Sequence, residues 1–476
     1  MGQDSQDNEL TLGPGSRVHI VGIGGAGMSA IARILLESGS AVSGSDRQAN
    51  DITHDLARHG ATIHEGHAAQ NISGAQALFV SSAIKEDNPE LIEARVSGIP
   101  ILTRRQFFKY LLPDRTQIAV AGTHGKTTTT ALIIHLLRET GHDPSYIVGG
   151  TLNATGDNAH VGKGKAFVVE ADEYGGMFLG LSPKIAVLTN VEWDHPDQFP
   201  TLDDMLATFR SFLQRLPAGG TLIACADDPH ALALAQARRV VGQPCLTYSI
   251  SSVQADWQAN LEFGGDTDKT QFMVRHGDQQ QRVSSPQAGT HNVLNCLAAL
   301  AAVYTFGVPL EEAANAVRSF AGTGRRFEIM GQAGGVTAIS DYGHHPTAIR
   351  ATLQAARQRY PGKTIWAIWQ PHTYSRTRTL ASQFATAFSD ADHVLITDIY
   401  AARETPAPGD LMAGDMALLI AKTSHADARH SGDLSATESI LAREIKPGAV
   451  VIIFSAGDAP RIGEALLRDL KPKSAS

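Results

Sequence analysis

The chain has 476 residues, 43% hydrophobic and 18% charged, which allows two to four domains with packed cores and excludes an intrinsically disordered protein. The net charge of −8 gives no support to a nucleic-acid partner. The cysteines Cys225, Cys245 and Cys296 are scattered without a disulfide-like spacing, and no apolar run approaches the roughly 18 residues of a membrane span. We therefore expect a three-domain cytoplasmic protein with no membrane insertion.

A strand, a glycine turn, a helix and a second strand are predicted over residues 17–46. The turn has the spacing Gly22-x-Gly24-x-x-Gly27, and the second strand ends at Asp46. Such glycines let the backbone approach a pyrophosphate, and an acid at this distance accepts hydrogen bonds from a ribose. The pattern predicts a pyrophosphate-bearing ligand, with NAD as the first candidate and tight helix packing without a ligand as the alternative.

Two further short strands are predicted at residues 77–82 and 99–103, and the first of them ends in the hydroxyls of Ser81 and Ser82. Residues 111–116 contain a helix-breaking proline and read as a linker.

The second predicted unit opens with a strand, a glycine-bearing turn and a helix over residues 117–137. The turn reads Gly-Thr-His-Gly-Lys-Thr-Thr over residues 122–128, in which backbone amides and the helix N-terminus can hold a triphosphate. Lys126 supplies a positive charge, and the hydroxyl of Thr127 can ligate Mg²⁺. The loop departs from a standard Walker A motif, because Val120 stands where that motif requires glycine. A strand-to-helix turn without any ligand is the alternative.

Two later predicted strands, within residues 166–176 and 184–197, end in acid-rich turns. The side chains at these ends are Glu170, Asp172, Glu173, Asn190, Glu192, Asp194 and His195. Because ligands of open parallel sheets lie at the carboxyl ends of strands, these groups predict a Mg²⁺ site beside the triphosphate. Ordinary solvated turns are the alternative.

A helix predicted over residues 289–308 carries His291, Asn292 and Asn295 in its first turn. The two asparagines, three residues apart, share a helix face and could cap the helix or contact a base. Their position alone favours capping.

A second boundary is expected within residues 320–328, and the chain beyond it predicts a third α/β unit. Its predicted strands lie within residues 336–342, 364–370, 391–398 and 448–455. Polar loops follow each strand, and Arg376 and Arg378 in one of them can grip a carboxylate or phosphate. No glycine fingerprint follows the first of these strands, so we do not expect this unit to hold a nucleotide by itself.

A fingerprint unit, a triphosphate-holding unit and a third unit with basic loops together suggest a joining reaction. At this point the sequence resembles the muramyl ligases (Mur ligases), ATP-dependent amide-forming enzymes of peptidoglycan biosynthesis, and thus of cell-wall biogenesis, cell shape and cell division. The resemblance lies in residues 22–28, 121–128, 170–173, 190, 194–195, 291–295, 325–326 and 341–346. It implies an α/β fold of three domains: a Rossmann-like nucleotide-sugar domain (1–113), a central P-loop ATPase-like parallel-sheet domain (114–322) and a Rossmann-like amino-acid domain (323–476).

The resemblance also implies the ligands and their residues. UDP-N-acetylmuramate would be bound by Gly22, Gly24, Gly25, Gly27, Met28, Asp46, Ser81 and Ser82. ATP would be bound by Gly122, Thr123, His124, Gly125, Lys126, Thr127, Thr128, His291, Asn292, Asn295 and Arg326, which replaces the capping interpretation of the asparagines. L-alanine would be bound by Tyr342, His344, His372 and Arg376. Two Mg²⁺ ions would be held by Thr127, Glu173 and His195, and the catalytic residues would be Lys126, Glu173, His195 and Arg326.

The implied reaction passes through an acyl phosphate on the lactyl carboxylate of the sugar, which the amine of L-alanine then attacks. Residues 370–377 and 398–404 resemble the branch that adds L-alanine more than the sibling branch that attaches a preformed tripeptide. Several family members carry a carbamylated lysine after the Asp-His motif, but no lysine occurs here between Asp197 and Thr221. Many members of the alanine branch have arginine where Thr373 stands, so Thr373 is left out of the site.

Three rival functions remain open at this level. An NAD-dependent oxidoreductase leaves the Lys126 loop unexplained, a non-enzymatic nucleotide switch would show no substrate-stimulated phosphate release, and the tripeptide-adding ligase is the nearest sibling. A monomer and a homodimer are both compatible with the sequence.

Overall fold

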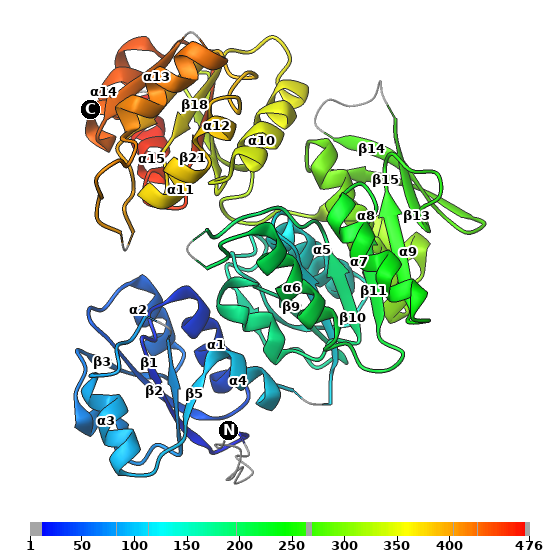
Figure 1. The fold of residues 1–476 in the computed structure, drawn as a ribbon, viewed down its shortest axis with the longest axis vertical. Coiled ribbons are helices and arrows are strands. Elements are labelled where there is room, and N and C mark those ends of the chain that lie inside the picture. Colours follow the sequence, from blue (N-terminus) through cyan, green and yellow to red (C-terminus); the bar gives the residue numbers. More distant parts are fainter. Residues whose placement is uncertain are drawn as a thin grey trace.

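The computed structural model describes residues 12–471 apart from residues 82, 113, 197, 263–268, 403 and 426. In these described ranges the strands form three successive sheets of five, ten and six strands. The N-terminal unit (blue) and the C-terminal unit (orange) both lie against one side of the central unit (green; Figure 1). The expected three-unit α/β fold is confirmed.

The N-terminal sheet is parallel throughout and has the order β3-β2-β1-β4-β5. Its elements are β1 (Arg17–Val21), α1 (Ala26–Glu37), β2 (Ala41–Asp46), α2 (Asp51–Arg58), β3 (Thr62–Glu65), η1 (Ala69–Ile72), β4 (Ala77–Val80), α3 (Pro89–Val96), β5 (Ile101–Thr103), α4 (Arg104–Phe107) and η2 (Phe108–Tyr110). The strand order reverses between β1 and β4, and the crevice at such a reversal is where open α/β sheets bind ligands. The predicted glycine turn lies at this point, between β1 and α1.

The central sheet has the order β15-β14-β13-β12-β11-β10-β6-β9-β7-β8, and the strands from β13 to β7 in that order are parallel. Its elements are β6 (Thr116–Ala121), α5 (Lys126–Glu139), β7 (Ser145–Ile147), β8 (Ala159–His160), β9 (Ala166–Glu170), η3 (Tyr174–Gly180), β10 (Ile185–Leu188), α6 (Leu202–Leu213), β11 (Thr221–Cys225), α7 (Pro229–Val240), β12 (Cys245–Ser249), β13 (Trp257–Glu262), β14 (Thr270–His276), β15 (Gln279–Ser285), α8 (Thr290–Phe306), α9 (Leu310–Ala316) and η4 (Val317–Ser319). Helices α5 and α8 share one apolar core with this sheet. That core holds the phosphate-loop helix rigidly.

The C-terminal sheet has the order β16-β17-β21-β18-β19-β20, in which only the edge strand β16 is antiparallel to its neighbour. Its elements are β16 (Glu328–Ala333), β17 (Val336–Asp341), α10 (Pro346–Arg359), β18 (Ile365–Trp369), α11 (Tyr374–Thr379), α12 (Ala381–Phe384), β19 (His393–Thr397), α13 (Ala413–Thr423), β20 (Ala428–Gly432), α14 (Leu434–Glu444), β21 (Val450–Phe454) and α15 (Pro460–Asp469). The four strands predicted here are confirmed as β17, β18, β19 and β21. The two edge strands, β16 and β20, were missed because neither has the buried apolar run that marks the inner strands.

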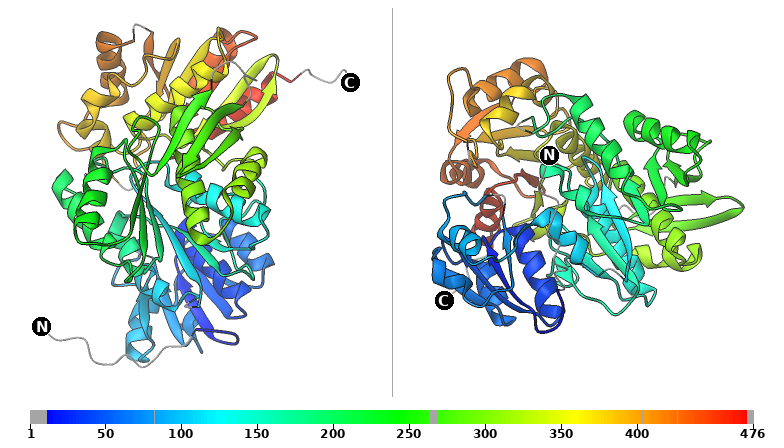
Figure 2. Two further views of the ribbon diagram at one scale, coloured as in Figure 1. Left: turned by 90° about the vertical axis from the view of Figure 1, so that its right-hand side faces the viewer. Right: turned by 60° about the horizontal axis from the view of Figure 1, so that its bottom comes forward.

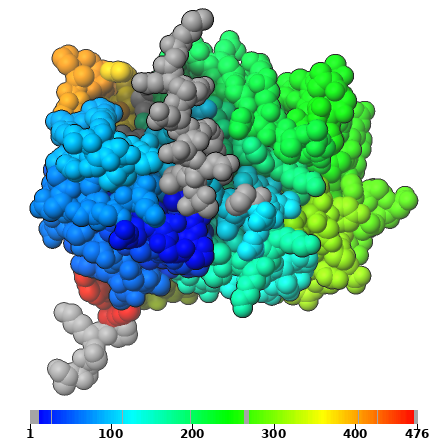
Figure 3. All heavy atoms as spheres, turned by 90° about the horizontal axis from the view of Figure 1, so that it is seen from below, coloured from blue at the N-terminus to red at the C-terminus, as the bar shows by residue number. Residues whose placement is uncertain are grey.

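Helix α1 joins the N-terminal unit to the central one. Arg33 Nη1 lies 2.8 Å from Asp157 Oδ1, and the Glu37 carboxylate accepts the Val161 amide at 2.6 Å. Figure 3 shows the two units side by side from below, and Figure 2 shows all three units in two further views. Among the described residues, no helix combines the length and apolar character needed to cross a bilayer.

A buried carboxylate stabilises the N-terminal unit beneath β2. Glu90, at the start of α3, is fully buried and accepts hydrogen bonds from Ser45 Oγ at 2.7 Å and Asn71 Nδ2 at 2.7 Å. Burial alone would raise the pKa of Glu90, but the nearby His19 ring and hydrogen bonds from Ser45 and Asn71 lower it to about 2. A carboxyl group whose folded pKa lies below its unfolded value stabilises the fold once it is ionised.

We expect Glu90→Gln to lower the stability of the N-terminal unit at pH 7 by about 3 kcal/mol, from a pKa displaced from 4.5 to about 2. The contribution is fully present above pH 4.5 and is lost as the pH falls towards 2, so the difference from wild type should shrink over that range. Amide hydrogen exchange in β1 and β2 measures this difference in stability. Glu93→Gln, on the same helix but bonded to the exposed Ser97 hydroxyl, is the matched control, and an equal effect there would refute the assignment.

Candidate active site

The phosphate loop between β6 and α5 adopts a backbone that only glycine accommodates. Gly122 has φ +134° and Gly125 has φ +80°. A Cβ on Gly122 would lie 2.1 Å from Thr189 Oγ1, and one on Gly125 would lie 2.4 Å from Asn295 Oδ1. Both glycines therefore satisfy a steric demand as well as a conformational one.

Lys126 begins α5 and is held over the loop. Its ammonium donates to the Gly122 carbonyl at 2.6 Å and to the two carboxylate oxygens of Glu173 at 3.0 and 2.8 Å. Burial alone would lower the pKa of Lys126, but the surrounding carboxylates, with Glu173 first, outweigh it and raise the pKa. The lysine is thus a fixed positive charge at the mouth of the loop.

The predicted acidic turns meet beside this lysine. Thr127 Oγ1 donates to Glu170 Oε1 at 2.9 Å, and His195 Nε2 lies 3.7 Å from Glu173 Oε1. Burial raises the pKa of Glu173 to about 7. His195 has φ +55°, a strained backbone of the kind that clusters at functional sites. Hydroxyl and carboxylate oxygens are the ligands that Mg²⁺ prefers, so this set fits the metal that the sequence implied.

The segment between the second and third sheets brings a guanidinium to the loop. Arg326 Nη2 donates to Thr127 Oγ1 at 3.3 Å, and its Cζ lies 4.9 Å from the centre of the Tyr342 ring. Arg325 stacks on the same ring at 5.0 Å and donates to the Gly457 carbonyl at 3.0 Å. Arg325 therefore anchors the segment, while Arg326 reaches the phosphate loop.

A second group of predicted residues surrounds Asp194. Arg376 Nη2 lies 2.8 Å from Asp194 Oδ1, Arg376 Nη1 lies 3.1 Å from His372 Nδ1, and His344 Nε2 lies 3.9 Å from Asp194 Oδ2. Burial would raise the pKa of Asp194, but Arg376 and the neighbouring histidines hold it well below its usual range. Burial lowers the pKa of His372 to about 4. Tyr342, whose ring is 5.2 Å from that of His344, completes this group.

The predicted adenine residues lie at the start of α8, on the other side of the loop. Asn295 Oδ1 accepts from Thr129 Oγ1 at 3.3 Å, and Asn295 Nδ2 donates to Asn292 Oδ1 at 3.0 Å. The N-cap of α8 is Gly289, so the capping alternative for the asparagines is wrong. His291 also lies in the first turn of α8, and burial lowers its pKa to about 4.

The N-terminal fingerprint is held together by Asp46, whose Oδ2 accepts the Gly24 amide at 2.9 Å. A Cβ on Gly22 would lie 3.0 Å from the Ser81 side chain, so the glycine turn and the end of β4 are in contact. Gly25 is the N-cap of α1. The Met28 side chain is buried in the hydrophobic core. Ser82 lies outside the described residues.

Arg104 was not predicted from the sequence, although a basic pair at the end of the predicted strand 99–103 was a usable signal. A Cβ on Gly27 would lie 2.7 Å from Arg104 Nη1. Both residues line a cavity of about 180 Å³ between the N-terminal and central units, together with Ile147, Val148, Gly149, Ala30, Glu170 and Asp172. The cavity extends from Gly27 of the fingerprint to Glu170 and Asp172 at the end of β9.

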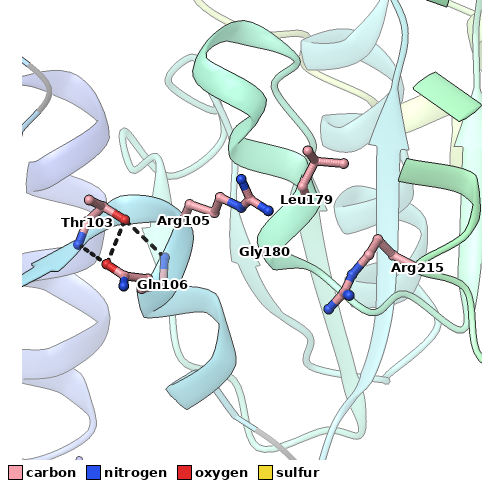
Figure 4. Close-up of a pocket in the computed structure, with 6 residues that line it drawn as sticks. All are labelled: Thr103, Arg105, Gln106, Leu179, Gly180 and Arg215. Carbon is pink, nitrogen blue, oxygen red and sulfur yellow. Dashed lines mark hydrogen bonds between the residues drawn. The ribbon is translucent and has the colours of Figure 1, made fainter. Parts of the chain in front are cut away.

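A larger cavity of about 540 Å³ lies beside α4 and is lined by Thr103, Arg105, Gln106, Leu179, Gly180 and Arg215. Arg105 and Arg215 extend into it from the two units, whereas Thr103 and Gln106 hydrogen-bond to each other (Figure 4). Of the predicted site residues that the structure describes, none lines this cavity.

Comparison with known proteins gives three family-model matches: the catalytic domain of the Mur ligase family over residues 17–115, the Mur ligase middle domain over 120–303, and the Mur ligase glutamate ligase domain over 325–457. The chain belongs to the Mur ligase family. Relatives named UDP-N-acetylmuramate–L-alanine ligase include that of Renibacterium salmoninarum, 43% identical over 95% of each chain. That of Syntrophotalea carbinolica is also 43% identical, over 96% of this chain and 98% of its own.

Solved structures show the same architecture. The UDP-N-acetylmuramate–alanine ligase of Thermotoga maritima matches this Mur ligase with a TM-score of 0.78 at 26% identity, covering 95% of this chain and 98% of its own. A murein peptide ligase from Psychrobacter arcticus matches with a TM-score of 0.69 at 27% identity, covering 97% of this chain and 100% of its own.

The steric role of the phosphate-loop glycine gives a prediction with an internal control. We expect Gly125→Ala to weaken ATP binding at least about tenfold, because the new methyl group must displace Asn295. Gly141→Ala, with φ +78° but nothing within 4 Å of its Cβ, incurs only the cost of the left-handed backbone, about 1 kcal/mol of stability. Titration calorimetry with ATP separates them, and equal affinities in the two variants would contradict the steric role.

Proposed function

We propose that this Mur ligase uses ATP to join L-alanine to the lactyl carboxylate of UDP-N-acetylmuramate, releasing ADP and phosphate in peptidoglycan precursor synthesis. The observation that carries the proposal is that Arg326, from the segment before the third sheet, donates to Thr127, the residue that follows Lys126 in the phosphate loop, while Lys126 is held over that loop by Glu173. Phosphoryl transfer needs positioned positive charge above all, and these two side chains supply it from different units. The names of the near full-length relatives support the choice of substrates.

Lys126 and Arg326 would bind the transferred phosphoryl group, and the amides of residues 122–128 would hold the remaining phosphates. Attack by a carboxylate on a phosphate brings two anions together, which a fixed ammonium and a guanidinium make less unfavourable. Asn292, Asn295 and His291 would bind the adenine, next to Gly125.

Thr127, Glu173 and His195 would hold Mg²⁺, with two ions as part of the proposal. When bound, such ions neutralise the phosphate charge and orient the two reacting oxygens.

Tyr342, His344, His372 and Arg376 would bind L-alanine. Because burial keeps His344 and His372 neutral near pH 7, their rings can hydrogen-bond to the amino acid without repelling its ammonium group. Binding of the alanine carboxylate by Arg376 requires it to exchange part of its bonding to Asp194 or His372.

UDP-N-acetylmuramate would be bound by the residues that the resemblance implies, Gly22, Gly24, Gly25, Gly27, Met28, Asp46, Ser81 and Ser82, with Arg104 added as a candidate phosphate contact. We assign residues 1–113, 114–322 and 323–476 to the nucleotide-sugar, ATP and amino-acid domains. The cytoplasmic location and the choice between monomer and homodimer stay predictions.

Phosphate release from ATP in the presence of UDP-N-acetylmuramate tests the function, with L-alanine, glycine, L-serine or the tripeptide added in turn. We expect release that depends on L-alanine. Release only with the tripeptide would assign the chain to the murein peptide ligase branch, and NAD(P)H-dependent absorbance change with a hydroxy acid would point to an oxidoreductase.

Lys126→Ala should lower turnover by about 10³-fold or more, because it removes the fixed charge from the phosphate loop. UDP-N-acetylmuramate binding, measured by calorimetry, should stay within about twofold of wild type, since the nucleotide sugar is assigned to a separate domain. Lys165→Ala, an exposed lysine of the same unit, is the control. Loss of sugar binding in the Lys126 variant would refute the domain assignment.

A further inference from the structure

Glu192, in the loop after β10, bonds to two domains at once. Its Oε2 lies 2.8 Å from His124 Nε2 in the phosphate loop, and its Oε1 accepts the Thr347 hydroxyl of the C-terminal unit at 2.8 Å. His345 Nδ1 lies 3.8 Å from the same carboxylate. No role in the proposed chemistry uses this carboxylate.

On the central-domain side, hydrogen bonds tie Glu192 to the phosphate loop. Glu192 exchanges two hydrogen bonds with Thr123, whose Oγ1 donates to the Glu192 carbonyl at 2.8 Å and accepts its amide at 2.9 Å. The His124 amide in turn donates to Asn190 Oδ1 at 2.9 Å. Glu192 is therefore bound to the phosphate loop through backbone and side chain together, and it must follow any movement of that loop.

The residues of the C-terminal unit that contact Glu192 lie at the beginning of α10. His345 is the N-cap of this helix and accepts the Thr347 amide at 3.3 Å through Nδ1, and its side chain is 1% exposed. The His345 and His124 rings are 4.8 Å apart. Because Tyr342 and His344 immediately precede this cap, the position of α10 also sets the position of the loop assigned to L-alanine.

The Glu192 carboxylate is ionised near pH 7, which strengthens its contact with Thr347. Burial alone would raise the pKa of Glu192, but hydrogen bonds and charge from His124, His345 and Thr347 lower it to about 2. Burial lowers the pKa of His345 to about 4, so that ring is neutral near pH 7. A charged acceptor makes the Thr347 hydrogen bond stronger than one between neutral groups.

We propose that Glu192 is a positioning residue that couples docking of the C-terminal domain, through Thr347 and His345, to the conformation of the phosphate loop, through His124. The loop of Tyr342 and His344 then reaches its position for binding the amino acid only when the phosphate loop is ordered. Docking of the C-terminal domain orders the phosphate loop in return. The part of this inference that concerns L-alanine rests on the proposed function.

The variants that isolate the contact are Thr347→Val, Glu192→Gln and the double variant, with Thr386→Val on the exposed surface of the same unit as control. Thr347→Val keeps the shape of the side chain and removes the hydroxyl donor. Loss of a hydrogen bond to a charged group corresponds to about tenfold or more in an equilibrium. We expect the KM for L-alanine to rise about tenfold in Thr347→Val while its KM for ATP stays within about twofold.

The double variant should be less impaired than the product of the two single effects, because Thr347→Val removes the donor and Glu192→Gln removes the charge of the same hydrogen bond. Amide hydrogen exchange in residues 122–125, followed without substrates, should accelerate in Thr347→Val although the substitution lies in another domain. This measurement does not depend on turnover, so it separates failure of the coupling from failure of the proposed reaction, which wild-type phosphate release tests.

Unchanged exchange in residues 122–125, or effects of the two single substitutions that multiply in the double variant, would overturn the proposal. So would a fall in thermal stability with no change in either KM, which would assign a merely structural role. His124, Glu192 and His345 also place three ligand atoms within 4.8 Å of one another. Calorimetry with ZnCl₂ that shows micromolar binding in wild type and none in Glu192→Gln would replace the coupling role with a metal site.

Discussion

The contact between the Lys126 ammonium and the Glu173 carboxylate is the one on which the candidate site depends. Glu173 is 1% exposed, and a buried pair of opposite charges loses about 3–5 kcal/mol when either partner is removed. The sheet order explains why the two meet. Strand β6 pairs with β9 on one side and with β10 on the other, so the loops that follow these three strands share one edge. The lysine follows β6, the Glu170–Glu173 turn follows β9, and the Asn190–His195 turn follows β10.

In the described part of the chain, three side chains of the C-terminal part donate hydrogen bonds to this same edge. Arg326 contacts Thr127, Thr347 contacts Glu192, and Arg376 contacts Asp194. Each of these contacts pairs a donor of the C-terminal part with an oxygen of the central unit, and two of the three donors are guanidinium groups, which add positive charge beside the acidic edge. The proposed coupling between the ends of the site assigned to the amino acid and to the phosphates depends on these contacts forming together.

Backbone strain is concentrated around this junction. Four non-glycine residues with positive φ lie at it: His195, Arg325, Phe327 and Thr373. Such conformations cost roughly 1–3 kcal/mol each and persist only where surrounding contacts hold them. The Arg325 guanidinium bonds to the Gly457 carbonyl, and the Phe327 amide bonds to Asp341, which identifies the contacts that hold the linker in shape. The strained linker is what directs Arg326 towards the phosphate loop.

Much of the fold could be predicted because its signals are local. The turns at Gly22 and Gly122 were recognised from glycine spacing next to apolar strands, and the inner strands of the third sheet from their buried runs. The edge strands β16 and β20 were missed because their residues are polar and half-exposed. Asn292 and Asn295 were first interpreted as helix caps, since only the folded chain shows that Asn295 lies against Gly125.

The sequence by itself determined the three α/β units, the phosphate loop and the family, because a strand, a glycine turn and a helix each depend on neighbouring residues. Tertiary structure alone decided which distant groups are partners: Glu173 for Lys126, Asp194 for Arg376, and Thr347 for Glu192. Arg104 belongs to the same class, since its place over Gly27 depends on the packing of α4 against the fingerprint turn. The physical reason is that a charge selects its partner by burial and distance, and both are set by strand order and domain docking rather than by spacing along the chain.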